Sequence, residues 1–205
     1  MRIFKNPKIY LLSLLICFAL TNFGWRNADE KPLEVADFTL KNVDGKYISL
    51  ANYPNSEGFM VVFVCNHCPM AKLYYNKLNT LATYYQAKGY PLIAINPMDS
   101  LLYEEETWEQ MGKLSKAKKM VYPYLQDPTQ AFAKSLGVTH TPQAYVLTKG
   151  SNNNYKVVYN GAIDNGESDD ILKSYLAKTV NLLIANKPIT EPKHTAIGCA
   201  VYYRK

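Results

Sequence analysis

Apolar and polar positions along the chain follow two different periods, one of strand type and one of helix type. A continuous apolar run of strand length lies at 58–64, and further largely apolar stretches of strand length lie at 91–96, 143–148 and 155–161. The last two runs are separated by an Asn-rich loop and are expected to pair as a hairpin. Ahead of them, residues 37–50 contain two short apolar stretches around Asp44-Gly45. An Asp-Gly pair in this setting predicts a β-hairpin extension at the front of the domain.

Apolar residues at helical spacing follow several of these strands. The clearest stripe consists of Met70, Leu73, Tyr74, Leu78, Leu81 and Tyr85. Helices are therefore predicted from about Pro69 to Lys88, around Tyr103 to Lys118, between Pro128 and Gly137, and from a Ser168 cap to about Asn186. This order of elements predicts an α/β fold with a central mixed sheet and helices on both faces.

The domain organisation follows from changes in composition along the 205 residues. Residues 33–186 are predicted to form one domain, since no repeat or linker interrupts them and the length suffices for a substantial core. Residues 187–205 contain two prolines and are predicted to be an extended C-terminal tail. The acidic run Glu104–Glu106 is interpreted as the solvated first turn of a helix.

The N-terminal segment 1–26 has the features of an export signal. A basic start precedes about a dozen apolar residues at 9–20, and a polar exit follows. That run is shorter than the roughly 20 residues of a stable span. The prediction is an exported, periplasmic protein, with an uncleaved membrane tether as the alternative. The membrane would then be contacted only through this segment.

The charge balance argues against a nucleic-acid partner. Of the 23 basic residues, four precede Asp29, which leaves 19 basic against 17 acidic residues in the remainder. A nearly neutral domain lacks the basic surface that binds a phosphate backbone. The sequence also lacks a glycine-rich phosphate loop or dinucleotide fingerprint. We therefore expect no bound cofactor, and electrons would arrive by thiol exchange with another protein.

The candidate chemistry lies in Cys65-Asn66-His67-Cys68, between a buried strand and a predicted helix. Pro69 suits the first turn of that helix. A thiol near free backbone N–H groups at a helix start is stabilised as a thiolate. Cys65 is accordingly predicted to be the exposed, low-pKa nucleophile. Cys68, one turn on, is predicted to be the resolving thiol.

Several of these stretches together resemble the thioredoxin-fold redoxins of the alkyl hydroperoxide reductase and thiol-specific antioxidant group. They are the strand, the Cys65–Pro69 motif, its helix, the front hairpin and the Thr141-Pro142 pair. The resemblance implies a thiol-disulfide oxidoreductase whose partners are protein thiols and disulfides. It also implies that Pro142 is cis and borders the site, and that Thr141 offers its backbone to a bound substrate.

His67 resembles the residue before the second cysteine in disulfide isomerases and periplasmic oxidants. Such a neighbour would stabilise the reduced form and raise the potential from about −270 mV towards about −120 to −180 mV. The sequence departs from thioredoxins at Phe59 and Val64, where a buried acid and a tryptophan are usual. A general cytoplasmic reductase is therefore disfavoured.

Three alternatives remain open from the residues alone. A thiol peroxidase would need a cation beside its thiolate, but Arg26 and Arg204 are the only arginines after the apolar run. A zinc site could be built from Cys65, Cys68 and Cys199 with His67 or His194, although no second C-x-x-C exists and no bound metal is expected. A silent binding module could retain the cysteines for stability alone.

Cys199, in the tail stretch AIGCAVYY, also resembles a Gly-Cys ending found in a bacterial subgroup of thioredoxin-like proteins. An odd third thiol in an oxidising compartment is shielded, paired or used in the redox cycle. Docking of the tail beside the site would make Cys199 an auxiliary thiol. Docking elsewhere would make it a small buried apolar residue.

Overall fold

The structure is a computed structural model that describes residues 33–166 and 170–205. The segment predicted to direct export or to tether the chain, 1–26, lies outside the described residues, and so does Ser168. Within the two described ranges, no helix combines the length and the apolar character needed to cross a membrane.

Short strands and helices alternate along the described chain. The strands are β1 (Glu34–Val35), β2 (Leu40–Asn42), β3 (Tyr47–Ile48), β4 (Gly58–Phe63), β5 (Leu92–Asn96), β6 (Tyr124–Gln126), β7 (His140–Thr141), β8 (Gln143–Lys149), β9 (Tyr155–Gly161) and β10 (Cys199–Ala200). The helices are α2 (Pro69–Lys72), α3 (Tyr75–Gln86), α4 (Trp108–Ala117), α5 (Ala131–Leu136) and α6 (Tyr175–Ile184), with 3₁₀ turns η1 (Leu50–Asn52), η2 (Glu104–Glu106) and η3 (Ile171–Lys173).

A mixed sheet runs through the centre of this region in the order β1-β9-β8-β4-β5-β6-β2-β3. Strand β4 pairs in parallel with β5 and antiparallel with β8, and all six of its residues are buried. A strand buried on both faces requires a continuous apolar run, which is what the sequence contains there. The front hairpin β2–β3 joins the sheet through β6, with Gly45 at a φ of +89° in its turn.

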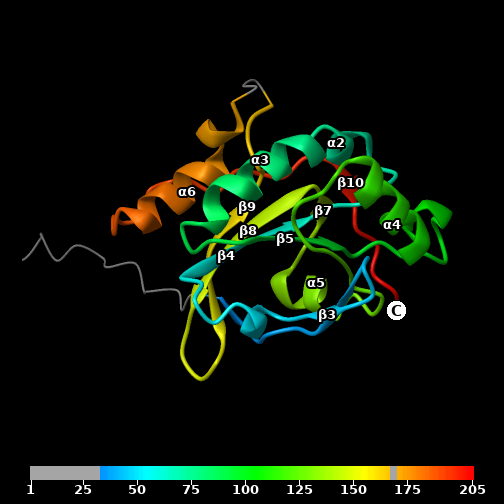
Figure 1. Ribbon diagram of the computed structural model, residues 1–205, viewed down its shortest axis with the longest axis horizontal. Helices are drawn as coiled ribbons and strands as arrows, with labels where there is room; N and C mark the ends of the chain where they lie inside the picture. Colours follow the sequence, from blue (N-terminus) through cyan, green and yellow to red (C-terminus); the bar gives the residue numbers. More distant parts are fainter. Residues whose placement is uncertain (1–32, 167–169) are drawn as a thin grey trace, which may run out of the picture. The chain divides into compact units, whose positions relative to one another are not determined.

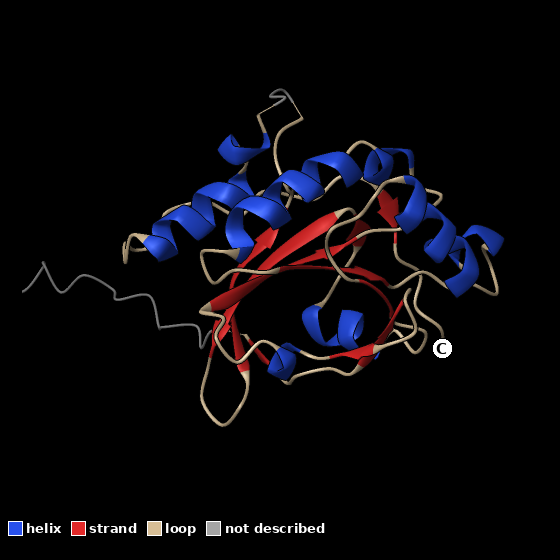
Figure 2. Cartoon of the chain, viewed as in Figure 1, coloured by secondary structure: helices blue, strands red, loops and turns tan. Residues whose placement is uncertain are grey.

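Helices cover both faces of the sheet, which curls around α5 (Figure 1). Figure 2 shows α3 and α6 on one side of the strands and α5 on the other, next to the β2–β3 hairpin. Phe132 of α5 packs against Phe38 and Phe63, with ring centroids 4.6 and 6.2 Å apart. The α/β thioredoxin-like fold predicted from the sequence, with helices on both faces and a front hairpin, is confirmed.

Two predicted helices are divided in the structure. The helix expected from Pro69 to Lys88 is α2 followed by α3, because Leu73 and Tyr74 donate to carbonyls three residues back instead of four. The helix expected from Tyr103 is η2 followed by α4, with Thr107 in an extended conformation between them. The last helix begins after Ser174, whose hydroxyl accepts a hydrogen bond from the Ala177 N–H.

The tail returns to the domain and adds a strand. Its β10 pairs antiparallel with β7, and Cys199 lies opposite Thr141 in the register. In Figure 1 this short strand, near the end of the colour range, lies beside β7. The C-terminal tail therefore reaches the segment that contains the Thr141-Pro142 pair.

Candidate functional site

The two cysteines of the C-x-x-C stretch follow β4 and precede α2. Cys68 is the N-cap residue of α2 and Pro69 is its first helical residue. Both cysteines are free thiols and neither side chain has exposed surface. The loop therefore brings two reduced sulfurs to the start of a helix, as the sequence predicted, but seals them from solvent.

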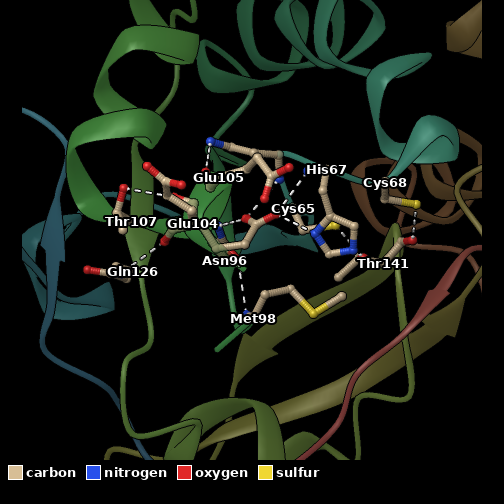
Figure 3. A network of polar contacts seen from close by, with 12 residues as sticks. Cys65, His67, Cys68, Asn96, Met98, Glu104, Glu105, Thr107, Gln126 and Thr141 are labelled. Atoms are coloured by element: carbon tan, nitrogen blue, oxygen red, sulfur yellow. Dashed lines mark hydrogen bonds and ion pairs between the residues drawn. The ribbon is translucent and has the colours of Figure 1, made fainter. Parts of the chain in front are cut away.

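The buried carboxylate of Glu106 holds this loop in place. Its Oε1 accepts hydrogen bonds from the backbone N–H of His67 at 2.8 Å and from the His67 ring at 2.6 Å. Its Oε2 accepts from the backbone N–H of Asn66 at 2.9 Å and from the side chain of Asn96 at 2.6 Å. Figure 3 shows this network around the loop. Four donors compensate for the burial of the carboxylate.

The sequence interpretation of Glu104–Glu106 as a solvated helix turn is wrong for Glu106. Its neighbours Glu104 and Glu105 are exposed, whereas Glu106 has no exposed surface. The 3₁₀ turn η2 directs one of three identical residues inwards. Burial of Glu106 depends on partners 10 to 40 positions away, so no local signal distinguishes it from the other two.

His67 is oriented by the same carboxylate. Since an ionised carboxylate only accepts, Nδ1 of the ring carries the hydrogen of the 2.6 Å bond. The ring also stacks on Tyr103, with centroids 4.4 Å apart. One ligand atom each of Cys65, His67 and Glu106 lie within 4.8 Å of one another. His67 is thus close to the thiols, and its effect on the potential stays a prediction.

The Thr141-Pro142 peptide bond is cis, which confirms the expectation from the sequence resemblance. Cys65 Sγ and Thr141 Oγ1 share a hydrogen bond of 2.9 Å. The Cys68 thiol donates to the Thr141 carbonyl at 3.2 Å. Both sulfurs therefore contact the residue before the cis-proline, and Figure 3 shows Cys68 pointing towards it.

Cys199 is the third thiol at this place. Cys199 lies opposite Thr141, whose carbonyl accepts the hydrogen bond from the Cys68 thiol, and hydrogen bonding by Cys199 acts to lower the pKa of Cys68. Unlike the other two, Cys199 is partly exposed. The docking alternatives left open by the sequence are thereby resolved, because the tail lies beside the C-x-x-C stretch.

The pKa values of the two central thiols shift in opposite directions. Burial raises the pKa of Cys65, the Thr141 hydrogen bond opposes this rise, and the nearby Glu106 charge adds to it. Burial also acts to raise the pKa of Cys68, but hydrogen bonds from Cys199 and from backbone N–H groups of α2 outweigh it and lower the value. The expectation of an exposed Cys65 is therefore wrong, and its pKa shifts in the direction opposite to the one expected. Cys68, not Cys65, is the N-cap residue that receives these hydrogen bonds.

Two of the side chains that could bind a metal near the thiols already have protein partners. The zinc set considered from the sequence used Cys199 and a histidine, but the cluster of ligating groups found in the described residues is Cys65, His67 and Glu106. All four lone-pair positions of the Glu106 carboxylate already accept hydrogen bonds from nitrogen donors. His194 stacks on Tyr175, with centroids 3.5 Å apart, and pairs with Glu191. The Glu106 carboxylate and the His194 ring are therefore both engaged by protein partners.

The arginine that a peroxidase site would use is engaged elsewhere. Arg204, the one arginine within the described residues, forms an ion pair with Asp99 through its guanidinium. Its backbone N–H also donates to Gln130 at 2.9 Å. The cation thus anchors the tail through Asp99.

A hollow of about 300 Å³ opens beside the cis-proline. Met70 of α2, Pro142 and Ile197 of the tail contribute apolar surface to it, and Ile197 is 72% exposed. An apolar hollow next to buried thiols is suited to a partner side chain.

The comparisons with known proteins agree with this architecture. The sequence model of the AhpC/TSA family matches residues 33–159. A hypothetical protein from Sinorhizobium meliloti is 28% identical and superposes with a TM-score of 0.76, over 87% of this chain and 97% of its own. A thiol-disulfide oxidoreductase from Bacteroides fragilis is 17% identical with a TM-score of 0.50, over 63% and 89% of the two chains. This last likeness concerns the fold.

A curated plant relative matches part of the chain. A protein described as probable glutathione peroxidase 2, from Arabidopsis thaliana, is 33% identical over 78 residues. The match covers 38% of this chain and 45% of the plant protein, so the chain spans less than half of that relative's length.

Proposed function

Since the chain belongs to the AhpC/TSA family, we propose that it is a thiol-disulfide oxidoreductase that exchanges disulfides with protein partners through Cys65 and Cys68. The observation that carries this proposal is the arrangement of the pair. Both thiols contact the residue before a cis-proline, and one of them has a lowered pKa while the other has a raised one. Thiol exchange needs one thiolate to attack and a second thiol to resolve.

The unequal pKa values suggest the order of events within the pair. The lowered pKa of Cys68 makes it the better attacking thiol of the pair, and Cys65 then closes the disulfide. In the net reaction a partner disulfide gains two electrons and two protons, which the two thiols of the pair lose. The pair loses two electrons and forms the Cys65–Cys68 bond. This order reverses the roles inferred from the sequence.

Further parts of the proposal concern the surroundings of the pair. His67, fixed by Glu106, would tune the potential, and Thr141 with Pro142 would border the bound partner. The apolar hollow beside Pro142 supports a protein partner, whose side chain it can receive. The proposal also includes an exported, periplasmic location, with residues 1–26 as signal or tether. The disulfide exchange proposed here suits such an oxidising compartment.

A thiol peroxidase is the second candidate, because the curated plant relative is described as a glutathione peroxidase. The Cys68 thiolate would then attack a peroxide and Cys65 would resolve the sulfenic acid as a disulfide, with release of water. The engagement of Arg204 by Asp99 weighs against this candidate, since it leaves no described arginine to hold the peroxide.

The test is turnover by the full-length chain with two substrates, insulin and hydrogen peroxide, with dithiothreitol as electron donor. We expect insulin reduction that falls at least a hundredfold in Cys68→Ser but persists in the control Cys17→Ser. Rapid peroxide consumption with no insulin reduction would favour the peroxidase. Equal turnover in all variants would reject both enzymes.

A further inference from the structure

The proposed exchange pair has no exposed surface, which raises the question of how a partner protein reaches it. Cys65 and Cys68 are fully buried beneath Thr141 and the tail. A partner disulfide must come into contact with a sulfur atom to react. Among the described residues, Cys199 is the one thiol with exposed surface, and it lies opposite Thr141, which bonds both buried sulfurs.

The tail is anchored on both sides of Cys199. Upstream, the Ala162 N–H donates to the His194 carbonyl at 2.9 Å. Downstream, the Val201 N–H donates to the Thr139 carbonyl at 2.9 Å, and the buried side chain of Gln130 donates to the Tyr202 carbonyl at 2.9 Å. Contacts on both sides, together with the β10–β7 pairing, hold Cys199 opposite Thr141, the residue that bonds Cys68.

Gly198 permits this close approach. A Cβ atom at that position would lie 2.0 Å from the Thr141 carbonyl oxygen and 3.1 Å from Pro142 Cδ. Real Cβ atoms do not come this close to backbone, so only glycine fits between the cis-proline segment and the tail. The absence of a side chain at Gly198 therefore lets the tail pack directly against the cis-proline segment.

We propose that Cys199 is a third redox-active thiol, which takes over the disulfide from the buried Cys65–Cys68 pair and presents it at the surface to a partner dithiol. This inference rests on the proposed exchange function of the pair. It assigns the tail a part in the chemistry, as the route between the buried sulfurs and the partner.

The relay is an internal exchange followed by an intermolecular one. Cys199 loses its proton and its sulfur attacks Cys68 Sγ. The Cys68–Cys199 bond forms, the Cys65–Cys68 bond breaks, and Cys65 leaves as a thiolate that takes up the proton. The Thr141 hydroxyl, 2.9 Å from Cys65 Sγ, can donate to this leaving sulfur. No electrons are gained or lost in this step.

A dithiol of the partner protein then completes the cycle. One partner thiolate attacks the sulfur of the partly exposed Cys199 and expels Cys68 as a thiolate. The second partner thiolate attacks the mixed disulfide and releases Cys199, so the partner loses two electrons and the protein gains them. A thiol with a low pKa leaves readily, and Cys68 is the thiol of lowered pKa. The reverse sequence would reduce a partner disulfide.

The protonation of Cys199 is suited to acting after Cys68 has been oxidised. Burial and the hydrogen bond to Cys68 raise the pKa of Cys199 to about 11 while the pair is reduced. Formation of the Cys65–Cys68 disulfide removes the charge of Cys68, which is one cause of that rise. Cys199 therefore ionises more readily when there is a disulfide to attack.

The experiment maps disulfides in the full-length chain after oxidation with diamide, acid quenching, alkylation and non-reducing mass spectrometry. We expect both Cys65–Cys68 and Cys68–Cys199 bonds in the wild type, and an intramolecular Cys68–Cys199 bond in Cys65→Ser. If Cys65–Cys68 forms but Cys68–Cys199 is found in neither protein, the relay is wrong and the exchange function stands. If no disulfide forms in the wild type, both fail.

A kinetic readout keeps the test independent of how well Cys65→Ser folds. The oxidised wild type and the oxidised Cys199→Ser variant are each reduced with thioredoxin as a protein-sized dithiol. In the variant, the disulfide left at the site is Cys65–Cys68. We expect reduction of Cys199→Ser to be at least tenfold slower. Equal or faster reduction would overturn the relay, because the tail would then merely cover the pair.

Discussion

Two segments meet at the sulfur of Cys68 and are held there in different ways. The loop 65–68 is fixed by one buried carboxylate that accepts four hydrogen bonds. The tail around Cys199 is fixed by strand pairing, by Gln130 and by the absence of a Cβ at Gly198. Removing the Glu106 side chain would break all four hydrogen bonds at once, whereas the tail contacts come from several separate residues. The loop therefore depends on one side chain and the tail on many.

The largest effect is expected on the loop side. Glu106→Ala leaves four buried or part-buried donors without their acceptor and should lower the free energy of unfolding by about 3–5 kcal/mol. Insulin reduction should be lost as well, since the loop that holds both thiols loses its anchor. Urea unfolding measures the first effect. The matched control is Glu104→Ala, an exposed neighbour in the same turn, which should stay within about 0.5 kcal/mol of wild type.

The tail side should respond more weakly. Gly198→Ala places a Cβ against the Thr141 carbonyl, so β10 must shift away, at a cost of about 1–3 kcal/mol. Hydrogen exchange at the Val201 amide, which bonds to Thr139, should accelerate at least tenfold while amides of β4 stay protected.

The control for the tail is Gly112→Ala in α4, where the nearest atom to a new Cβ is 3.9 Å away. Alanine is favoured over glycine inside a helix, so this variant should be neutral or more stable by up to about 1 kcal/mol. If Gly198→Ala behaved like Gly112→Ala, the tail would not be seated as described.

The smallest effect is expected on the pKa of Cys68, the residue at which the loop and the tail meet. Replacing Cys199 with alanine removes its thiol hydrogen bond and should raise the pKa of Cys68, while Cys199→Ser, which keeps a donor, should largely restore it. A lowered pKa means that the thiolate persists to lower pH, so the Cys199→Ala transition should appear at higher pH. Thiolate ultraviolet absorbance reports this without needing reagent access. Coincident titrations in all three proteins would contradict the assigned contact.

The sequence was informative where local pattern determines structure. The apolar run of β4 and the Asp44-Gly45 turn predicted their elements, because burial and turn geometry act within a few residues. The positions of both central cysteines and the cis Pro142 were also expected. The directions of the two cysteine pKa shifts were not expected. The causes of the shift at Cys68 include Cys199, which lies 131 positions away in the sequence. Burial of Glu106 and pairing of β10 with β7 likewise depend on contacts between residues distant in sequence. The local pattern of apolar and polar residues does not predict such contacts.

The most direct test of the account is a redox titration of the full-length protein in glutathione buffers, with the free thiols counted by alkylation and mass spectrometry. We predict one two-electron transition in which the Cys65–Cys68 pair is oxidised together, at a potential within the range of about −270 to −120 mV known for exchange proteins. Cys68→Ser should abolish that transition. Thiols that stay reduced throughout, or a transition unchanged in Cys68→Ser, would contradict the claim that this pair is the site of exchange.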